Sequence, residues 1–270
     1  MIAMQYKDML NGKSVIRELS EYATARGKEI GYENVFDYSL GNPSVPAPET
    51  FKKAMIKLLT EADSLEVHGY SPSLGIIPVK EKIAASLNRR FGMDYSQKHI
   101  FMTSGAAGAI AHAVRAVTVE GDEVLTFAPF FPEYNPYINL SGARLKVVPA
   151  DTESFQVNFD RFREMLTDKV MAVLINTPNN PSGVVYKRET LEKLADIMRQ
   201  KGQEYGHEIY LISDEPYREI LFEGVEEVYV SKMYENTISC YSYSKSLSVP
   251  GERIGYIAVN PACKDAETIV

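Results

Sequence analysis

The chain has 270 residues, of which 45% are hydrophobic and 24% charged, and it carries a formal net charge of −7. This length allows one large domain or a large and a small one, and the apolar fraction excludes a disordered chain. The excess of acidic over basic residues disfavours a nucleic-acid partner. No apolar run is long enough to span a bilayer, so no membrane partner is predicted. With only Cys240 and Cys263, no disulfide framework, and no apolar signal segment in residues 1–13, we predict a cytoplasmic protein.

Helical and extended segments alternate along the chain. Apolar spacing predicts helices at residues 14–26, 49–61, 77–91, 106–118, 159–166 and 188–204. The expected inward face of the second helix includes Met55, Leu58 and Leu59. Short apolar segments predict strands at residues 100–103, 124–128, 145–148, 170–176, 209–213, 237–241 and 254–259. Because several strands are apolar on both faces, the predicted fold class is α/β, a mostly parallel seven-stranded sheet with helices on both faces.

Small or polar residues follow four of these strands, at the carboxyl ends where open α/β sheets bind ligands. The segments are Thr103–Gly108, Asn176–Gly183, Ser213–Tyr217 and Ser242–Lys245. Small residues at the start of a helix favour an anion such as phosphate in the first segment, although helix packing would also select them. The prolines of the second segment hold the Asn180 amide in a fixed place, which a plain turn could also explain.

Lys245 and Asp214 are the candidate reactive groups. A lysine in a partly buried pocket near a second cation, here Arg253, has a lowered pKa and can form a Schiff base, whereas most lysines are solvated surface charges. Asp214 could cap a turn, bind a metal or pair with a ring nitrogen. No set of His, Cys, Asp and Glu at metal-ligand spacing accompanies it, so no metal is predicted.

Together these segments resemble the class I/II aminotransferases, the fold-type I enzymes that use pyridoxal 5′-phosphate. The resemblance runs from about Tyr38 to about Val259. It is most specific in the motifs Pro178–Gly183, Asp214–Tyr217, Ser242–Lys245 and Arg253–Gly255. The order of the motifs, with 34 residues from Asn180 to Asp214 and 31 from Asp214 to Lys245, makes a coincidence improbable.

The resemblance implies a role for each matching residue. The catalytic residues would be Lys245, which forms the internal aldimine, Asp214, which pairs with the pyridine nitrogen, and Tyr217. The cofactor-binding residues would further include Asn180 at the phenolic oxygen, Phe131 against the ring, and Ser242, Arg253, Ala106 and Ala107 at the phosphate. Tyr70 would reach the phosphate of the neighbouring subunit in a homodimer, while Gly41 and Asn180 would line the site of the substrate carboxylate. The substrates would be an L-amino acid and a 2-oxo acid.

The resemblance also sets an expectation for the domains. Residues 1–45 would form an N-terminal arm and part of a small domain, and residues 46–270 the large pyridoxal-phosphate-binding domain. Family members usually continue for roughly another hundred residues, which complete the small domain and carry the arginine that binds the substrate carboxylate. We therefore expect the C-terminal part of the small domain to be absent here and transamination to be impaired.

Two other functions stay open at this point. A pyridoxal-phosphate-dependent C–S β-lyase would use the same lysine and aspartate, so the motifs do not separate it from an aminotransferase. A non-catalytic module that keeps the cofactor as a ligand, or has lost it, is the third reading. Release of pyruvate and ammonia without a 2-oxo acid acceptor would favour the lyase, and a colourless protein after addition of pyridoxal phosphate would favour the module.

Overall fold

The computed structural model describes residues 15–270, so the segment examined for a signal and the beginning of the predicted arm lie outside the described residues. The chain divides into two compact units, Met1–Pro46 and Ala47–Val270. The first unit contains helix α2 (Val15–Ile30) and the short 3-10 helix η1 (Tyr32–Asn34). Within residues 15–270, no helix has both the length and the apolar character needed to cross a bilayer.

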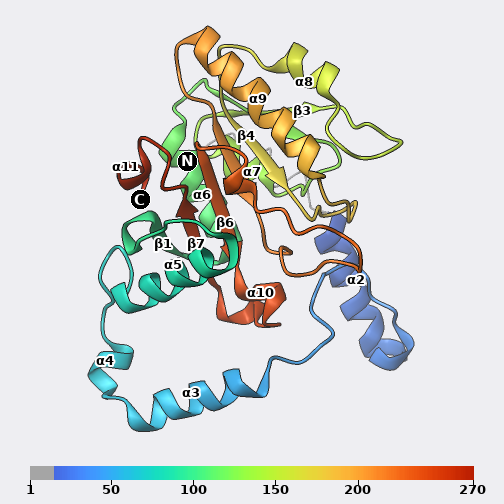
Figure 1. Cartoon of the computed structure of the whole chain (residues 1–270). Coiled ribbons are helices and arrows are strands. Elements are labelled where there is room, and N and C mark those ends of the chain that lie inside the picture. Colours follow the sequence, from blue (N-terminus) through green and yellow to red (C-terminus); the bar gives the residue numbers. More distant parts are fainter. Residues whose placement is uncertain (1–14) are drawn as a thin grey trace, which may run out of the picture. The chain divides into compact units, whose positions relative to one another are not determined.

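The second unit is built on one seven-stranded sheet with the strand order β1-β7-β6-β5-β4-β2-β3 (Figure 1). The strands are β1 (Ile100–Ser104), β2 (Glu123–Phe127), β3 (Arg144–Val148), β4 (Val170–Asn176), β5 (Tyr210–Asp214), β6 (Thr237–Ser242) and β7 (Ile254–Val259). Only β7 is antiparallel to its neighbours, β1 and β6. The prediction of a mostly parallel sheet is therefore confirmed, with each strand within one residue of its expected bounds.

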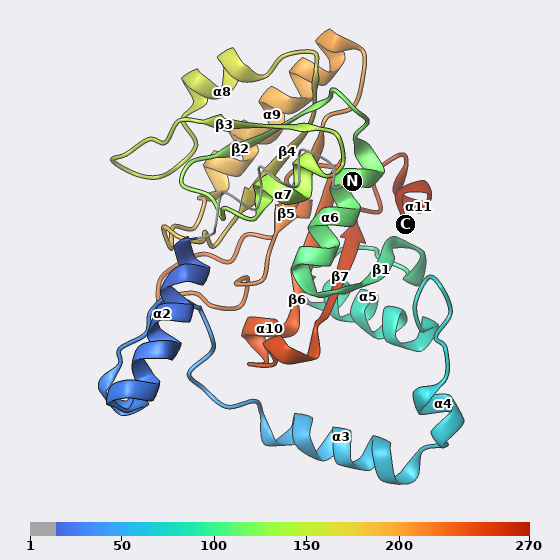
Figure 2. The same cartoon turned by 180° about the vertical axis from the view of Figure 1, so that it is seen from behind.

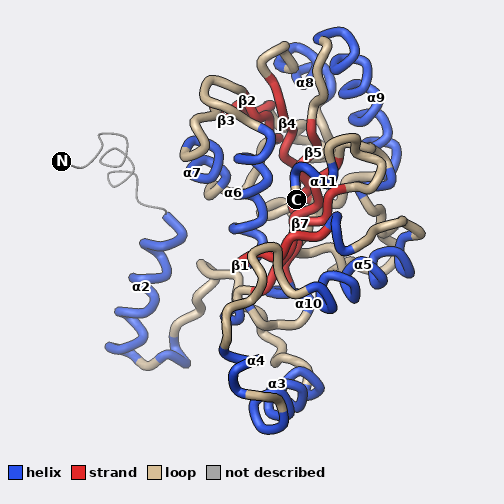
Figure 3. Tube along the Cα trace, turned by 90° about the vertical axis from the view of Figure 1, so that its left-hand side faces the viewer, coloured by secondary structure: helices blue, strands red, loops and turns tan. Residues whose placement is uncertain are grey.

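Helices cover both faces of the sheet, as the apolar strands predicted (Figures 2 and 3). One face carries α6 (Gly105–Val117) and α7 (Tyr134–Asn139), and the other carries α5 (Ile77–Phe91), α8 (Phe159–Met165) and α9 (Arg188–Tyr205). The strands contribute alternate residues to the cores of the two faces: Leu174 and Ile212 pack with α6, whereas Val173 and Leu211 pack with α8 and α9. Each strand can therefore be apolar throughout.

The remaining helices are short or lack a buried face. They are α3 (Glu49–Glu61), α4 (Ser64–His68), α10 (Tyr243–Ser246), α11 (Ala266–Ile269) and the 3-10 helices η2 (Gln97–His99), η3 (Val230–Lys232) and η4 (Pro250–Glu252). The expected inward face of α3 is wrong, because Met55, Leu58 and Leu59 are 37%, 46% and 59% exposed. Apolar periodicity predicts where a helix forms, but burial also needs a partner surface, and α3 buries none of its residues in the described chain.

The antiparallel strand β7 brings two distant motifs to one edge of the sheet. Strand β6 ends at Ser242, and the register pairs that residue with Gly255 near the beginning of β7. The connection through α10 and η4 therefore starts and finishes at the same edge. This edge is also the carboxyl end of β1, since Ser104 pairs with Ile254. Lys245 and Arg253, which lie on the connection, are thus placed where the parallel strands end.

Candidate active site

Asp214, the last residue of β5, places a buried carboxyl group at this edge of the sheet. It is 5% exposed, and its Oδ2 accepts a hydrogen bond of 2.6 Å from the Tyr134 hydroxyl. Its Oδ1 is buried and has no hydrogen-bond partner in the described chain. Burial raises the pKa of Asp214 to about 7, Tyr134 opposes the rise, and the charge on Glu215 adds to it. The site thus holds a carboxyl group that a cationic donor would stabilise as the anion.

The Asn176 side chain joins the ends of two neighbouring strands. Its amide nitrogen donates to the backbone carbonyl of Asp214 at 2.9 Å, and its oxygen accepts from the backbone N–H of Asn180 at 2.6 Å. The loop that follows β4 is stabilised by its own side chains, because the Asn179 side-chain oxygen accepts hydrogen bonds from both the backbone N–H and the hydroxyl of Ser182. Asn180 is therefore held in a defined position relative to Asp214.

Lys245 and Tyr217 lie next to each other at the same edge. The Lys245 ammonium is 5.9 Å from the centroid of the Tyr217 ring, and both side chains are half-buried. Burial lowers the pKa of Lys245. Burial and the charge on Asp214 raise the pKa of Tyr217, while the Asn180 amide opposes the rise. The structure thus brings the predicted residues Lys245, Asp214, Tyr217 and Asn180 into one cluster.

Arg253 lies against the first residue of α6. It has a positive φ of 53°, and its Nη2 donates to the carbonyl of Ser104 at 3.3 Å. A Cβ added to Gly105 would lie 2.7 Å from that nitrogen, so only glycine allows the guanidinium to approach. At Gly255, an added Cβ would lie 2.8 Å from the Gly105 Cα. Two glycines therefore let β7 and the beginning of α6 pack closely around the arginine.

The beginning of α6 offers further donors beside Arg253. The backbone N–H groups of Ala106 and Ala107 are in the first turn of this 13-residue helix, where they have no partner within the helix. The helix dipole adds positive potential there. Ser242 is 2% exposed, is the last residue of β6 and pairs with Gly255 of β7. Together these groups form a positive cradle suited to a phosphate group.

The other predicted residues differ in how well they join this cluster. Phe131 is half-buried and packs edge-on against Tyr134, with ring centroids 5.8 Å apart and an interplanar angle of 83°. Tyr70 is fully exposed in the single chain. Gly41 belongs to the first compact unit. The roles of Tyr70 and Gly41 stay predictions.

Two residues contact Asp214 in a way that the sequence did not predict, Tyr134 and Asn176; the region of Tyr134 was expected only to line the substrate pocket. Both act on Asp214, from 80 and 38 residues away along the chain. Asn176 was visible only as the first residue of a polar segment, and Tyr134 only as an aromatic residue close to Phe131. Motifs indicate the side chains that face a ligand, whereas the partners of those side chains become apparent only in three dimensions.

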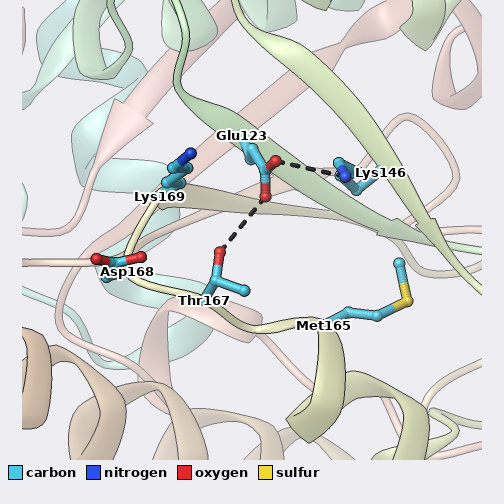
Figure 4. Close-up of a pocket in the computed structure, with 6 residues that line it drawn as sticks. All are labelled: Glu123, Lys146, Met165, Thr167, Asp168 and Lys169. Carbon is cyan, nitrogen blue, oxygen red and sulfur yellow. Dashed lines mark hydrogen bonds and ion pairs between the residues drawn. The ribbon is translucent and has the colours of Figure 1, made fainter.

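The opposite edge of the sheet has a hollow of a different character. It has a volume of about 320 Å³ and is lined by Glu123, Lys146, Met165, Thr167, Asp168 and Lys169 (Figure 4). Glu123 forms an ion pair of 3.4 Å with Lys146 and accepts a hydrogen bond from Thr167. These polar groups are paired with each other, and none of the predicted site residues lies in this hollow.

Comparisons with known proteins agree with the motifs. A profile of the family described as aminotransferase class I and II matches residues 33–269. The aspartate aminotransferase of Thermotoga maritima is 33% identical over 228 residues, which cover 83% of this chain and 58% of that protein. The aromatic-amino-acid aminotransferase 2 of Thermococcus litoralis is 30% identical over 256 residues, covering 93% and 61%. A crystal structure of an amino transferase from Eubacterium rectale has a TM-score of 0.95 and 44% identity, covering 100% of this chain and 68% of that one.

The chain belongs to the aminotransferase class I and II family, because the family profile matches most of its length. Members of this family use pyridoxal phosphate. The chain spans 58% and 61% of the lengths of the two curated relatives.

Proposed function

We propose that the chain is the cofactor-binding part of a pyridoxal-phosphate-dependent aminotransferase, which moves an amino group between an L-amino acid and a 2-oxo acid. One observation carries the proposal. The buried Oδ1 of Asp214 has no partner in the described chain, and it lies at the same edge of the sheet as a half-buried lysine with a lowered pKa. Such a pair of perturbed groups is typical of an active site.

The residues of the cluster fit pyridoxal phosphate at both of its ends. The unpartnered Oδ1 of Asp214 would accept a hydrogen bond from the protonated ring nitrogen, which would satisfy the buried carboxylate. Arg253, Ser242 and the first N–H groups of α6 would hold the phosphate dianion. Asn180 and Tyr217 would donate to the phenolic oxygen, and Phe131 would cover the ring and exclude water.

When bound, pyridoxal phosphate supplies an electron sink for the substrate's α-carbon. Lys245 is the residue placed to move a proton at that carbon. Burial lowers the pKa of its ammonium, which increases the share of neutral amine that can act as a base near neutral pH. General acid–base catalysis of this kind contributes about 10²–10⁴-fold in rate. With the cofactor bound, the Asp214 carboxylate would supply the negative charge that stabilises a protonated ring nitrogen.

The domain and partner assignments extend the same proposal. Residues 1–45 would form an N-terminal arm that belongs to a small domain, and residues 46–270 the cofactor-binding domain. A homodimer would place the exposed Tyr70 at the phosphate of the neighbouring subunit. Gly41 and Asn180 would line the site of the substrate carboxylate. The relatives named above act on different amino acids, aspartate in one case and aromatic amino acids in the other, so the class of substrate is proposed only as an L-amino acid.

The experiment uses the purified chain, added pyridoxal phosphate and reduction with borohydride. Peptide mass mapping should find the cofactor attached to Lys245, and Lys245→Ala should abolish the attachment. Transamination by any longer chain that contains this segment should fall by at least about 10²–10⁴-fold in the same variant. Lys146→Ala serves as the control, because that lysine lies at the opposite edge and pairs with Glu123.

Two outcomes would contradict the proposal in different ways. Attachment that persists in Lys245→Ala, at another lysine, would overturn the assignment of the catalytic residue. Release of pyruvate and ammonia from a cysteine-type substrate without a 2-oxo acid acceptor would replace the aminotransferase by a lyase.

A further inference from the structure

The segment Asp214–Arg218 presents its side chains to two faces of the sheet. Asp214 and Tyr217, three residues apart, belong to the candidate active site on the side of α7 and Lys245. Glu215 and Arg218, the residue after each of them, are buried among aromatic residues on the side of α5. Glu215 is only 2% exposed and Arg218 only 5%. Two residues that face the ligand are thus each followed by a buried charge on the other side.

The two buried charges bind each other directly. Arg218 Nη1 donates to Glu215 Oε2 at 2.9 Å, and the Ser239 hydroxyl on β6 donates to Oε1 at 3.0 Å. Both carboxylate oxygens are therefore satisfied. Burial raises the pKa of Glu215, and the charge on Arg218 opposes that rise. The hydroxyl of Ser231 lies 3.1 Å from that of Ser239 and extends the network.

Arg218 is enclosed by aromatic rings. The rings and the distances from the guanidinium carbon to their centroids are Tyr241 at 4.5 Å, Phe91 at 5.2 Å and Tyr229 at 5.5 Å. Arg218 Nη2 also donates to the Tyr256 hydroxyl at 3.3 Å. Glu219 Oε1 lies 3.5 Å from the same nitrogen. A planar guanidinium held by rings and by two carboxylates has one favoured orientation.

The pair is connected to the active-site side chains through the backbone. The N–H of Glu215 donates to the carbonyl of Cys240 on β6 at 2.8 Å, and the N–H of Arg218 donates to the carbonyl of Glu215 at 3.3 Å. The turn that carries Asp214 and Tyr217 is therefore closed by the same two residues that form the ion pair. A change in the pair would move the turn, and with it both side chains on the other face.

Stability alone is a weak reason for this arrangement, because replacing a buried ion pair by well-packed hydrophobic residues of similar volume is often neutral or stabilising. We propose that the Glu215–Arg218 pair is a positioning device, which holds Asp214 and Tyr217 in the orientation that the cofactor requires. This inference rests on the proposed function for its consequence, but the rigidity of the turn can be measured without any cofactor.

The experiment compares the wild-type chain with the double variant Glu215→Gln/Arg218→Met, which removes both charges. Amide hydrogen exchange of the cofactor-free protein reports the local opening of residues 214–220, and titration with pyridoxal phosphate reports its dissociation constant. The matched control is Glu235→Gln/Arg199→Met. That pair also combines an arginine–glutamate ion pair with an aromatic ring, since the Arg199 guanidinium lies 5.4 Å from the Tyr234 centroid, but its side chains are 38% and 40% exposed.

We expect the double variant to stay folded while residues 214–220 exchange about tenfold faster than in the wild type. The dissociation constant of pyridoxal phosphate should increase by about 10–100-fold, the usual effect of removing groups that orient a ligand-binding side chain. The control variant should change neither quantity. Arg218→Lys, which keeps the charge but loses the planar fork, should lie between the wild type and the double variant.

A folded double variant with unchanged exchange and unchanged affinity would overturn the inference. If the double variant does not fold, Arg218→Lys decides, and wild-type exchange together with wild-type affinity in that variant would also overturn it. If the wild-type chain binds no pyridoxal phosphate, the proposed function fails, and the exchange rates alone then decide whether the pair positions the turn.

Discussion

Asp214 and Glu215 are neighbours in the sequence and are both buried, and their side chains lie on opposite faces of the sheet. They differ in how many of their carboxylate oxygens have hydrogen-bond partners. Glu215 accepts hydrogen bonds on both oxygens, from Ser239 and Arg218. Asp214 accepts one from Tyr134 and leaves its other oxygen without a partner in the described chain. Buried polar groups in native proteins are nearly always satisfied. Both oxygens of Glu215 are thus occupied within the protein, whereas Asp214, which lies in the same cluster as the half-buried Lys245, has an oxygen free to accept the proposed ligand.

The largest expected effect comes from breaking the Glu215–Arg218 ion pair. Glu215→Gln removes the nearer carboxylate and leaves the buried Arg218 charge with only Glu219 among the described carboxylates, at 3.5 Å, which should lower the free energy of unfolding by about 3–5 kcal/mol. Urea unfolding of the cofactor-free chain measures it. Glu235→Gln, in the half-exposed pair with Arg199, should cost only about 0–1 kcal/mol. Equal losses in the two variants would show that burial does not distinguish these pairs.

Replacing Asp214, whose Oδ1 has no partner in the described chain, should change the free energy of unfolding in the opposite direction. Folded Asp214 keeps its proton up to a pKa of about 7, whereas the ordinary pKa of an aspartate side chain is 3.8. The titration of Asp214 therefore lowers the stability of the wild-type chain as the pH rises from about 4 to about 7, and this part of the loss should be absent in Asp214→Asn. Without cofactor, the variant should become more stable than the wild type by up to about 4 kcal/mol above pH 7, with a difference near zero below pH 4.

Thermal or urea unfolding of both proteins across this pH range checks the prediction. A stability difference that stays constant between pH 4 and pH 8 would contradict the raised pKa of Asp214. With pyridoxal phosphate bound, the sign should reverse, since the variant cannot supply the anion.

A smaller effect is expected from Tyr134→Phe, which removes the hydroxyl but keeps the ring. A hydrogen bond to a charged group contributes about 1.5–3 kcal/mol, so the affinity for pyridoxal phosphate should fall by about tenfold or more. The pKa of Asp214 should rise further, because Tyr134 lowers it. Tyr205→Phe is the matched control, since its hydroxyl donates to the carbonyl of Leu166. Equal affinities in the two variants would rule out the orienting role of Tyr134.

The smallest expected effect concerns the phosphate cradle. Gly105→Ala and Gly206→Ala both place alanine at a positive φ, 73° and 77°, which costs roughly 1–2 kcal/mol of stability in each. Only Gly105→Ala also displaces Arg253, because no atom lies within 4 Å of a Cβ added to Gly206. Binding of pyridoxal phosphate should therefore weaken only in Gly105→Ala, while the affinity for pyridoxal, which lacks the phosphate, should be equal in both.

The sequence predicted the elements of the sheet closely, because the strands are buried on both faces and their apolar runs end at turn residues. The bounds of β4 and β7 are those expected from their apolar runs. The burial of α3 could not be predicted in the same way. Its apolar periodicity is real, but whether a face is covered depends on a surface that its own residues do not define.

The sequence by itself determined the α/β class and the family, and it singled out the candidate reactive side chains, because motif chemistry and apolar patterning are local properties. Only the tertiary structure decided that Tyr134 and Asn176 orient Asp214, that antiparallel β7 returns Arg253 to the site, and that Glu215 pairs with Arg218 beneath it. Hydrogen bonding and desolvation depend on neighbours in space, so two adjacent carboxyl groups that look alike in the chain differ in the structure: one has a buried oxygen without a partner in the described chain, and the other forms an ion pair.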